Sequence, residues 1–139
     1  ESLGRLLAGH VTAWRGRYDR VVPVPLHTDR LRARGYNQAC ALARPVAKAL
    51  GAVCDPDAVA RVRAATSQTT AGRAQRADNV RDAFVVVHRA AMDGQRVLVV
   101  DDVCTTGATL GEVLRVVRAA GAHEAHGLTL AHASRWNPP

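Results

Sequence analysis

The sequence predicts an α/β protein in which a parallel sheet is covered by helices. Short β-prone apolar segments alternate along the chain with segments whose apolar residues recur at helical spacing. The clearest example, residues 97–117, runs from four β-prone residues through a polar turn into an amphipathic helix. Such alternation is typical of parallel sheets covered by helices, and 139 residues suffice for one domain with a moderate core.

The first elements are a helix and a short strand. Apolar residues at helical spacing predict a helix over residues 3–14, which Gly16 ends. Residues 20–25 are a β-prone run with two prolines. Because proline donates no backbone hydrogen bond, a fully bonded central strand is expected here only if Pro25 already lies in the loop.

The middle of the chain predicts one helix, two strands and a long polar segment. An alanine-rich helix is expected over residues 36–50, kinked at Pro45 and ended by Gly51. Loose alternation predicts a strand within residues 57–63, and a second within residues 83–87. Residues 64–79 contain almost no large apolar side chain, so this segment is either a surface loop or a lid over a site.

The end of the chain repeats the strand–helix alternation. Residues 97–100 predict a buried strand, followed by two carboxylates and a turn containing glycine and threonine. Apolar residues from Leu110 to Val117 predict the next helix, which Gly121 ends, and residues 125–133 alternate as a final strand. The turn falls at the carboxyl end of its strand, where open parallel sheets bind ligands.

The chemistry of this turn suits a phosphorylated sugar. The first turn of a helix leaves N–H groups unpaired, and its dipole favours an anion. Gly107 allows a positive φ, and threonines on both sides of it add hydroxyl donors. Asp101 and Asp102 repel phosphate, but they accept hydrogen bonds from vicinal hydroxyls, or hold Mg²⁺ directly or through water.

Residues 100–110, Val-Asp-Asp-Val-Cys-Thr-Thr-Gly-Ala-Thr-Leu, resemble the phosphoribosyl pyrophosphate (PRPP) signature of the type I phosphoribosyltransferases. The resemblance implies that the acidic pair contacts the ribose hydroxyls and that the turn cradles the 5′-phosphate. The PRPP-binding residues it implies are Asp101, Asp102, Val103, Thr105, Thr106, Gly107, Ala108 and Thr109.

Two further motifs narrow the resemblance. Residues 22–27 with residues 30–38, and then Gln68, Arg76 and the segment 79–84, resemble the ComF family (competence protein F-like, also called GntX-like) in the same order. The resemblance spans residues 20–131. It implies a type I phosphoribosyltransferase fold, with a central parallel sheet, flanking helices and a mobile polar loop.

The ComF resemblance also implies roles for these segments. Residues 25–34 would bind pyrophosphate, through Leu26, His27, Arg30 and Arg34. Residues 64–79 would close over the active site. The catalytic residues implied are Asp101, Asp102, Gln68, Arg73, Arg76 and Asn79. The reaction would be Mg²⁺-dependent transfer of phosphoribose from PRPP to an unidentified acceptor, expected to be a nucleobase as in nucleotide salvage, with release of pyrophosphate.

Composition limits the alternatives. The formal net charge of +7 suits anionic partners, although aromatic residues are only 4%, so a stacking platform for single strands is poorly supplied. Two other hypotheses stay open: a PRPP-binding protein without turnover, and a protein that handles single-stranded DNA during competence and DNA uptake. A homodimer is a further possibility.

Cysteine spacing and hydropathy set the expected context. Three cysteines without Cys-x-x-Cys spacing argue against a disulfide framework and against a zinc ribbon. We therefore expect residues 1–139 to form a single phosphoribosyltransferase domain, without the cysteine-rich zinc-binding segment that precedes it in the family. No apolar run reaches the roughly 20 residues of a membrane helix, so a cytoplasmic protein without a membrane span is expected.

Overall fold

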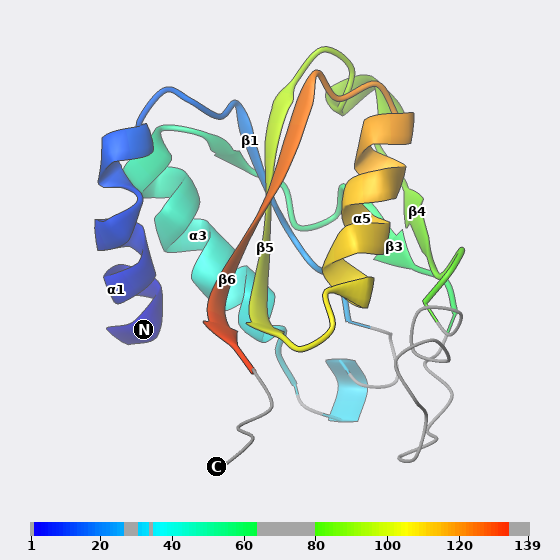
Figure 1. The fold of residues 1–139 in the computed structure, drawn as a ribbon, viewed down its shortest axis with the longest axis horizontal. Helices are drawn as coiled ribbons and strands as arrows, with labels where there is room; N and C mark the ends of the chain where they lie inside the picture. Colours follow the sequence, from blue (N-terminus) through cyan, green and yellow to red (C-terminus); the bar gives the residue numbers. More distant parts are fainter. Residues whose placement is uncertain (1, 27–30, 34, 64–79, 134–139) are drawn as a thin grey trace, which may run out of the picture.

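The computed structural model describes residues 2–26, 31–33, 35–63 and 80–133. Four strands form a parallel sheet in the order β2-β1-β5-β6 (Figure 1). Their bounds are Arg20–Pro23 for β1, Val53–Cys54 for β2, Arg96–Cys104 for β5 and Glu124–His132 for β6. The predicted α/β fold with a central parallel sheet is thereby confirmed.

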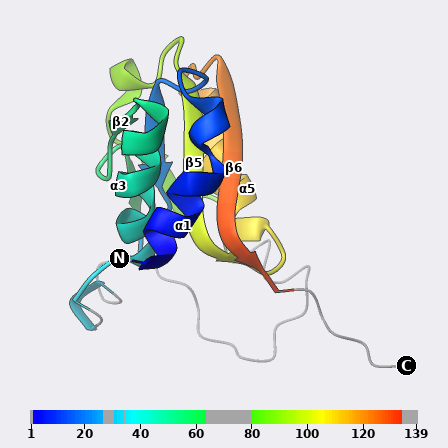
Figure 2. The same cartoon turned by 90° about the vertical axis from the view of Figure 1, so that its left-hand side faces the viewer.

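Helices cover both faces of this sheet. Helices α1 (Ser2–His10) and α3 (Gln38–Leu50) pack on one face, and α5 (Ala108–Ala119) packs on the other (Figures 1 and 2). Successive side chains of a strand point to opposite faces. Leu98 and Val100 of β5 therefore enter the core under α1 and α3, while Val97 and Val99 enter the core under α5. Burial on both faces explains the unbroken apolar run that the sequence shows.

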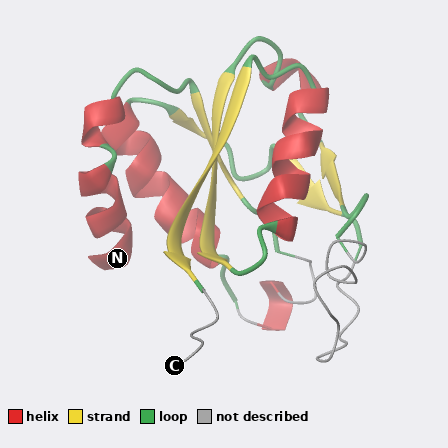
Figure 3. Cartoon of the chain, viewed as in Figure 1, coloured by secondary structure: helices red, strands yellow, loops and turns green. Residues whose placement is uncertain are grey.

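A second, smaller sheet lies beyond α5. Strands β3 (Val59–Arg61) and β4 (Phe84–Val86) pair antiparallel, apart from the main sheet (Figure 3). The sequence predicts both strands but not their separate pairing. The remaining short elements are the 3₁₀ turns η1 (Thr12–Trp14) and η2 (Arg89–Ala91).

Helix α3 is capped at both ends and packs closely against α1. The Asn37 side chain caps α3 by accepting a hydrogen bond from the Ala39 amide at 3.0 Å, and Gly51 ends α3 with φ of 71°. Pro45 lies inside α3, as predicted. Its ring faces α1 so closely that a Cβ on Gly4 would lie 2.8 Å from Pro45 Cγ. The proline thus forms part of the α1–α3 contact.

Two strands differ from the sequence-based expectation. Strand β2 is not predicted, because two residues carry no periodicity; it is held by parallel pairing with Arg20 and Val21 of β1. Strand β5 continues through both carboxylates to Cys104, whereas the sequence places them after the strand. The cause is β6, whose Thr129 pairs with Asp101 and whose His132 pairs with Cys104.

Candidate functional site

The connections leaving β1 and β5 diverge to opposite faces of the sheet. Helix α3 follows β1 and packs with α1, whereas α5 follows β5 on the other face (Figure 1). The strand order therefore changes direction between these neighbouring strands. In open α/β sheets this divergence leaves a crevice at the carboxyl ends of the two strands, and ligands bind there.

Strand β1 is the shorter of this pair, which exposes the end of β5. The last paired residues are Pro23 and Val100, and the Val24 amide donates to the Val100 carbonyl at 2.8 Å. Beyond that point, among the described strands, β5 is paired with β6 alone. Pro25 lies outside β1, so β1 can be a central strand despite its two prolines.

The turn from β5 to α5 has the backbone geometry of an anion site. Gly107 precedes α5 with φ of 78° and ψ of −2°, a left-handed conformation that favours glycine. Its carbonyl accepts a hydrogen bond from the Gly111 amide at 2.7 Å, which closes the first helical turn. The Thr106 hydroxyl faces the Ala108 amide at 3.4 Å, a weak contact that a ligand oxygen can replace.

A small cavity opens at this turn, with a volume of about 40 Å³. It is lined by Asp101, Val103, Cys104, Thr105, Thr106, Gly107, Ala108, Thr109 and Leu110. The structure thus brings together seven of the eight predicted PRPP-binding residues around one cavity. Its size is that of a single small group rather than of a whole ligand.

The eighth residue, Asp102, is not part of that lining. Asp101 and Asp102 are consecutive in β5, so their side chains leave opposite faces of the strand. Each carboxylate accepts a hydrogen bond from the next amide: Asp101 Oδ1 from Asp102 N at 2.9 Å, and Asp102 Oδ1 from Val103 N at 2.8 Å. Neither forms an ion pair with any cation in the described part of the chain.

The surroundings of the Asp101 carboxyl disfavour its ionised form. Burial, together with the neighbouring charge of Asp102, raises the pKa of its carboxyl from 3.8 to about 6. A half-buried carboxylate that has no cation partner among the described residues destabilises this part of the fold when it is ionised. Groups of this kind cluster at functional sites, which favours Asp101 as a ligand-binding residue.

Within the described residues, side chains alone do not supply a full set of ligands for a metal ion. No three His, Cys, Asp or Glu side chains within residues 2–26, 31–33, 35–63 and 80–133 are grouped to hold one. The two adjacent carboxylates supply hard oxygen ligands, which suit Mg²⁺ completed by water and by ligand oxygens.

Of the other predicted site residues, Leu26 alone lies within the described residues. Leu26 follows β1 and lines a second, larger cavity. His27, Arg30, Arg34, Gln68, Arg73, Arg76 and Asn79 lie outside the described residues.

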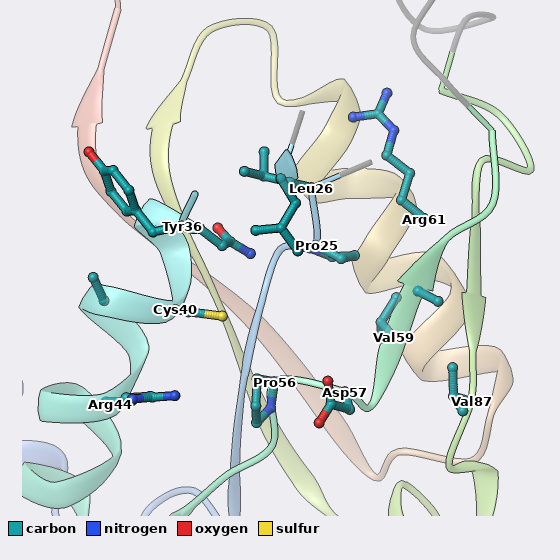
Figure 4. Close-up of a pocket in the computed structure, with 14 residues that line it drawn as sticks. Pro25, Leu26, Tyr36, Cys40, Arg44, Pro56, Asp57, Val59, Arg61 and Val87 are labelled. Carbon is teal, nitrogen blue, oxygen red and sulfur yellow. The ribbon is translucent and has the colours of Figure 1, made fainter. Parts of the chain in front are cut away.

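Sequence reasoning missed the larger cavity, a groove of about 680 Å³ between α3 and β3 (Figure 4). Its walls come from α3, from the exits of β1 and β2, and from β3. These segments are far apart in the sequence, and no motif links them. The nearest signal was the pair of prolines, Pro25 and Pro56, each a short distance after a strand.

Comparison with known proteins agrees with this geometry. Residues 37–137 match the phosphoribosyl transferase domain family. The chain belongs to this family. The match begins at the cap of α3 and includes β2, β5, β6 and the β5–α5 turn, whereas β1 precedes it.

Curated relatives of this chain are named DNA utilization and competence proteins. The chain is 36% identical over 104 residues to DNA utilization protein YhgH of Escherichia coli K12, covering 75% of this chain and 45% of the relative. It is 35% identical over 107 residues to competence protein F of Haemophilus influenzae, covering 76% and 47%. The chain thus spans less than half the length of these relatives. They confirm the ComF-like resemblance.

Solved structures show the same fold. Glutamine PRPP amidotransferase from B. subtilis, complexed with ADP and GMP, superposes with a TM-score of 0.62 at 26% identity, covering 92% of this chain and 25% of that one. Trypanosoma cruzi hypoxanthine phosphoribosyl transferase superposes with a TM-score of 0.57 at 11% identity, covering 96% and 73%. In the part of this chain that the structure describes, no helix has the length and apolarity needed to cross a bilayer.

Proposed function

We propose that this domain binds PRPP at the β5–α5 turn and transfers its phosphoribosyl group to an acceptor, with release of pyrophosphate. The observation that carries the proposal is the cavity at the turn, which combines the first amides of α5 with the carboxylate of Asp101, a group without an ion pair in the part of the chain that the structure describes. A ligand with a phosphate beside a diol satisfies both halves. Membership of the phosphoribosyl transferase family supports it.

The proposed roles divide the ligand into three parts. The 5′-phosphate lies on the turn from Thr105 to Thr109, where helix amides and hydroxyls donate. Asp101 and Asp102 accept hydrogen bonds from the ribose hydroxyls, one from each face of the strand end. Pyrophosphate lies at the exit of β1, on Leu26, His27, Arg30 and Arg34.

In the proposed reaction, the bond from ribose C1 to the pyrophosphate oxygen breaks and a bond from C1 to an acceptor nitrogen forms. The acceptor's proton leaves to pyrophosphate or to water. Positive charge develops on the ring, as in glycoside hydrolysis, and the carboxylates beneath it stabilise that charge. Mg²⁺, bound when PRPP is bound, would neutralise the departing pyrophosphate, with Asp101 and Asp102 as its protein ligands directly or through water. Gln68, Arg73, Arg76 and Asn79 belong to the segment proposed to exclude water.

The test is calorimetric titration of PRPP with Mg²⁺ into the wild type and Asp101→Asn. We expect the variant to bind at least tenfold more weakly, because the neutral amide cannot match a carboxylate as an acceptor for hydroxyls. Asn can still accept the Asp102 amide, so the backbone contact is retained. Asp93→Asn, at the opposite end of the sheet, is the matched control. Equal affinity of all three proteins would overturn the assignment.

Turnover is tested separately by pyrophosphate release with PRPP and each common nucleobase. Release with one base identifies the acceptor. Mg²⁺-dependent binding of PRPP without release for any base would favour a binding protein that has no turnover.

A second candidate function is handling of single-stranded DNA. It is favoured by the names of the relatives, DNA utilization protein and competence protein F, and by the net charge of +7. Binding to the phosphate backbone releases counterions, so affinity must fall steeply as salt rises. Fluorescence anisotropy with an oligonucleotide between 50 and about 200 mM salt checks this slope. Absent or salt-insensitive binding would exclude this function.

A further inference from the structure

The larger groove adjoins the pyrophosphate part of the proposed PRPP site, with which it shares Leu26, but it is separate from the cavity at the β5–α5 turn. Its volume of about 680 Å³ is within the range of small-molecule sites, roughly 300–1,000 Å³. Apolar side chains form most of its walls: Pro25 and Leu26 at the exit of β1, Pro56 after β2, and Val59 in β3 (Figure 4). The walls of the β5–α5 cavity share no residue with them.

Three charged side chains line this groove, Arg44, Asp57 and Arg61. Arg61 donates to the Arg63 carbonyl at 3.1 Å and lies over the Phe84 ring, so its guanidinium is already engaged. Arg44 reaches from α3 towards Pro56, and Asp57 lies across from it, after β2 (Figure 4). Both charges act on the nearby thiol of Cys40: burial raises the pKa of that thiol, Asp57 adds to the increase and Arg44 opposes it. Nevertheless Arg44 and Asp57 form no ion pair with each other, and neither has a side-chain hydrogen bond within the described residues.

The positions of Arg44 and Asp57 limit the kinds of ligand that the groove can bind. Pyrophosphate would leave Asp57 without a favourable contact, because the two carry like charge. The two charges of a free amino acid lie close together, and would require Arg44 and Asp57 to be adjacent. A flat heterocycle presents acceptors on one edge and donors on another, which suits two walls of opposite charge separated by an apolar gap.

We propose that the groove is a second ligand site, for a 6-oxopurine base or nucleoside. Arg44 donates to the O6 and N7 acceptors, and Asp57 accepts from the donors of the other edge. Adenine is disfavoured, because its N6 amino group faces the cation and its N1 acceptor faces the carboxylate. Proline and valine side chains contact the ring faces.

The site is not that of the acceptor, a conclusion that rests on the proposed function. Pyrophosphate is placed at the exit of β1, which contributes Pro25 and Leu26 to the groove. In a displacement, the nucleophile approaches from the side opposite the leaving group. A purine in the groove therefore lies on the wrong side of C1 and acts as an effector.

The structure also connects the groove to the exit of β1. The Asn37 amide nitrogen donates to the Val24 carbonyl at 3.0 Å, while its oxygen caps α3. The helix that carries Arg44 and the chain leaving β1 are thus fixed to one another. A purine in the groove presses on Leu26 and changes the affinity for PRPP.

The experiment uses guanosine, whose N9 already carries ribose and which therefore cannot serve as an N9 acceptor. Guanosine should bind the wild type, adenosine about tenfold more weakly, and Arg44→Gln or Asp57→Asn should each weaken guanosine binding about tenfold or more. Lys48→Gln, one turn further along α3, is the matched control and should bind normally. No binding to the wild type, or equal binding by all variants, overturns the proposal.

PRPP titrations separate the two sites. Arg44→Gln should bind PRPP normally when guanosine is absent, and Asp101→Asn should bind guanosine normally. The PRPP affinity of the wild type should change severalfold with saturating guanosine, and that of Arg44→Gln should not. Loss of guanosine binding in Asp101→Asn would place the nucleoside in the PRPP site and overturn the second site. If PRPP binds nowhere, the proposed function fails, whereas the guanosine result stands.

Discussion

The two ends of the parallel sheet treat their carboxylates in opposite ways. At the amino end, Asp19 accepts two hydrogen bonds from the Arg96 side chain and one from its amide, and Asp55 pairs with Arg20 at 2.7 Å. At the carboxyl end, Asp101 and Asp102 accept hydrogen bonds from backbone amides alone, as far as the described residues are concerned. The comparison teaches that carboxylates at one end hold strands together, while those at the other end reduce stability and lie where we propose that the ligand binds.

The largest effect is expected at the amino end. Arg20→Met leaves the partly buried Asp55 without its arginine partner and with the His88 ring 3.8 Å away, which should lower the free energy of unfolding by about 2–4 kcal/mol. Urea denaturation measures this. The double variant Arg20→Met with Asp55→Asn should recover part of the loss, because the Arg20 Nε is itself buried without a partner in the structure. If Arg20→Met alone left the free energy of unfolding unchanged, the two ends of the sheet would not differ in this way.

At the carboxyl end, removing a charge should increase the free energy of unfolding instead of lowering it. Asp101→Asn removes a carboxylate whose pKa is raised to about 6, so near pH 7.5 it should increase the free energy of unfolding by about 1–2 kcal/mol. The same variant should lose affinity for PRPP. Denaturation and calorimetry on one protein sample check both. A variant that is less stable than the wild type would contradict the view that Asp101 is retained for binding.

A smaller loss is expected at Asn37, which joins α3 to the exit of β1. Asn37→Ala removes the cap of α3 and the bond to the Val24 carbonyl, at an expected cost of about 1–2 kcal/mol. Asn37→Asp keeps the cap but not the donor, so it should lie between the wild type and alanine. Equal stability of Asp and wild type would show that the Val24 contact contributes nothing.

The smallest effect is a pH dependence at Asp19. Hydrogen bonds from the Arg96 side chain lower the pKa of Asp19 from 3.8 to about 2. A lowered pKa stabilises the fold above pH 4, and this contribution is lost as pH falls towards 2. The stability difference between wild type and Asp19→Asn should therefore be constant above about pH 5 and shrink on acidification. Because both side chains are about one-third exposed, solvent screens the pair and the difference is small. A difference that grows as pH falls would contradict the pairing.

How far the fold could be predicted depended on how local each signal was. The strand, turn and helix from residue 97 to residue 119 were recognisable because burial, glycine and helical spacing all lie within one short run. The pairing of the strands was not recognisable from the sequence. The extension of β5 through Cys104 depends on β6, and the two-residue strand β2 depends on β1.

By itself, the sequence determined the α/β class, the phosphate-type turn at Gly107 and the carboxylates before it, since these follow from neighbouring residues. Only the tertiary structure decided that Asp101 enters the cavity while Asp102 faces the other side of the strand, and that Arg44 and Asp57 share a groove. The physical reason is that strand register and the packing of α3 beside β3 arise from contacts between distant segments, which no local pattern encodes.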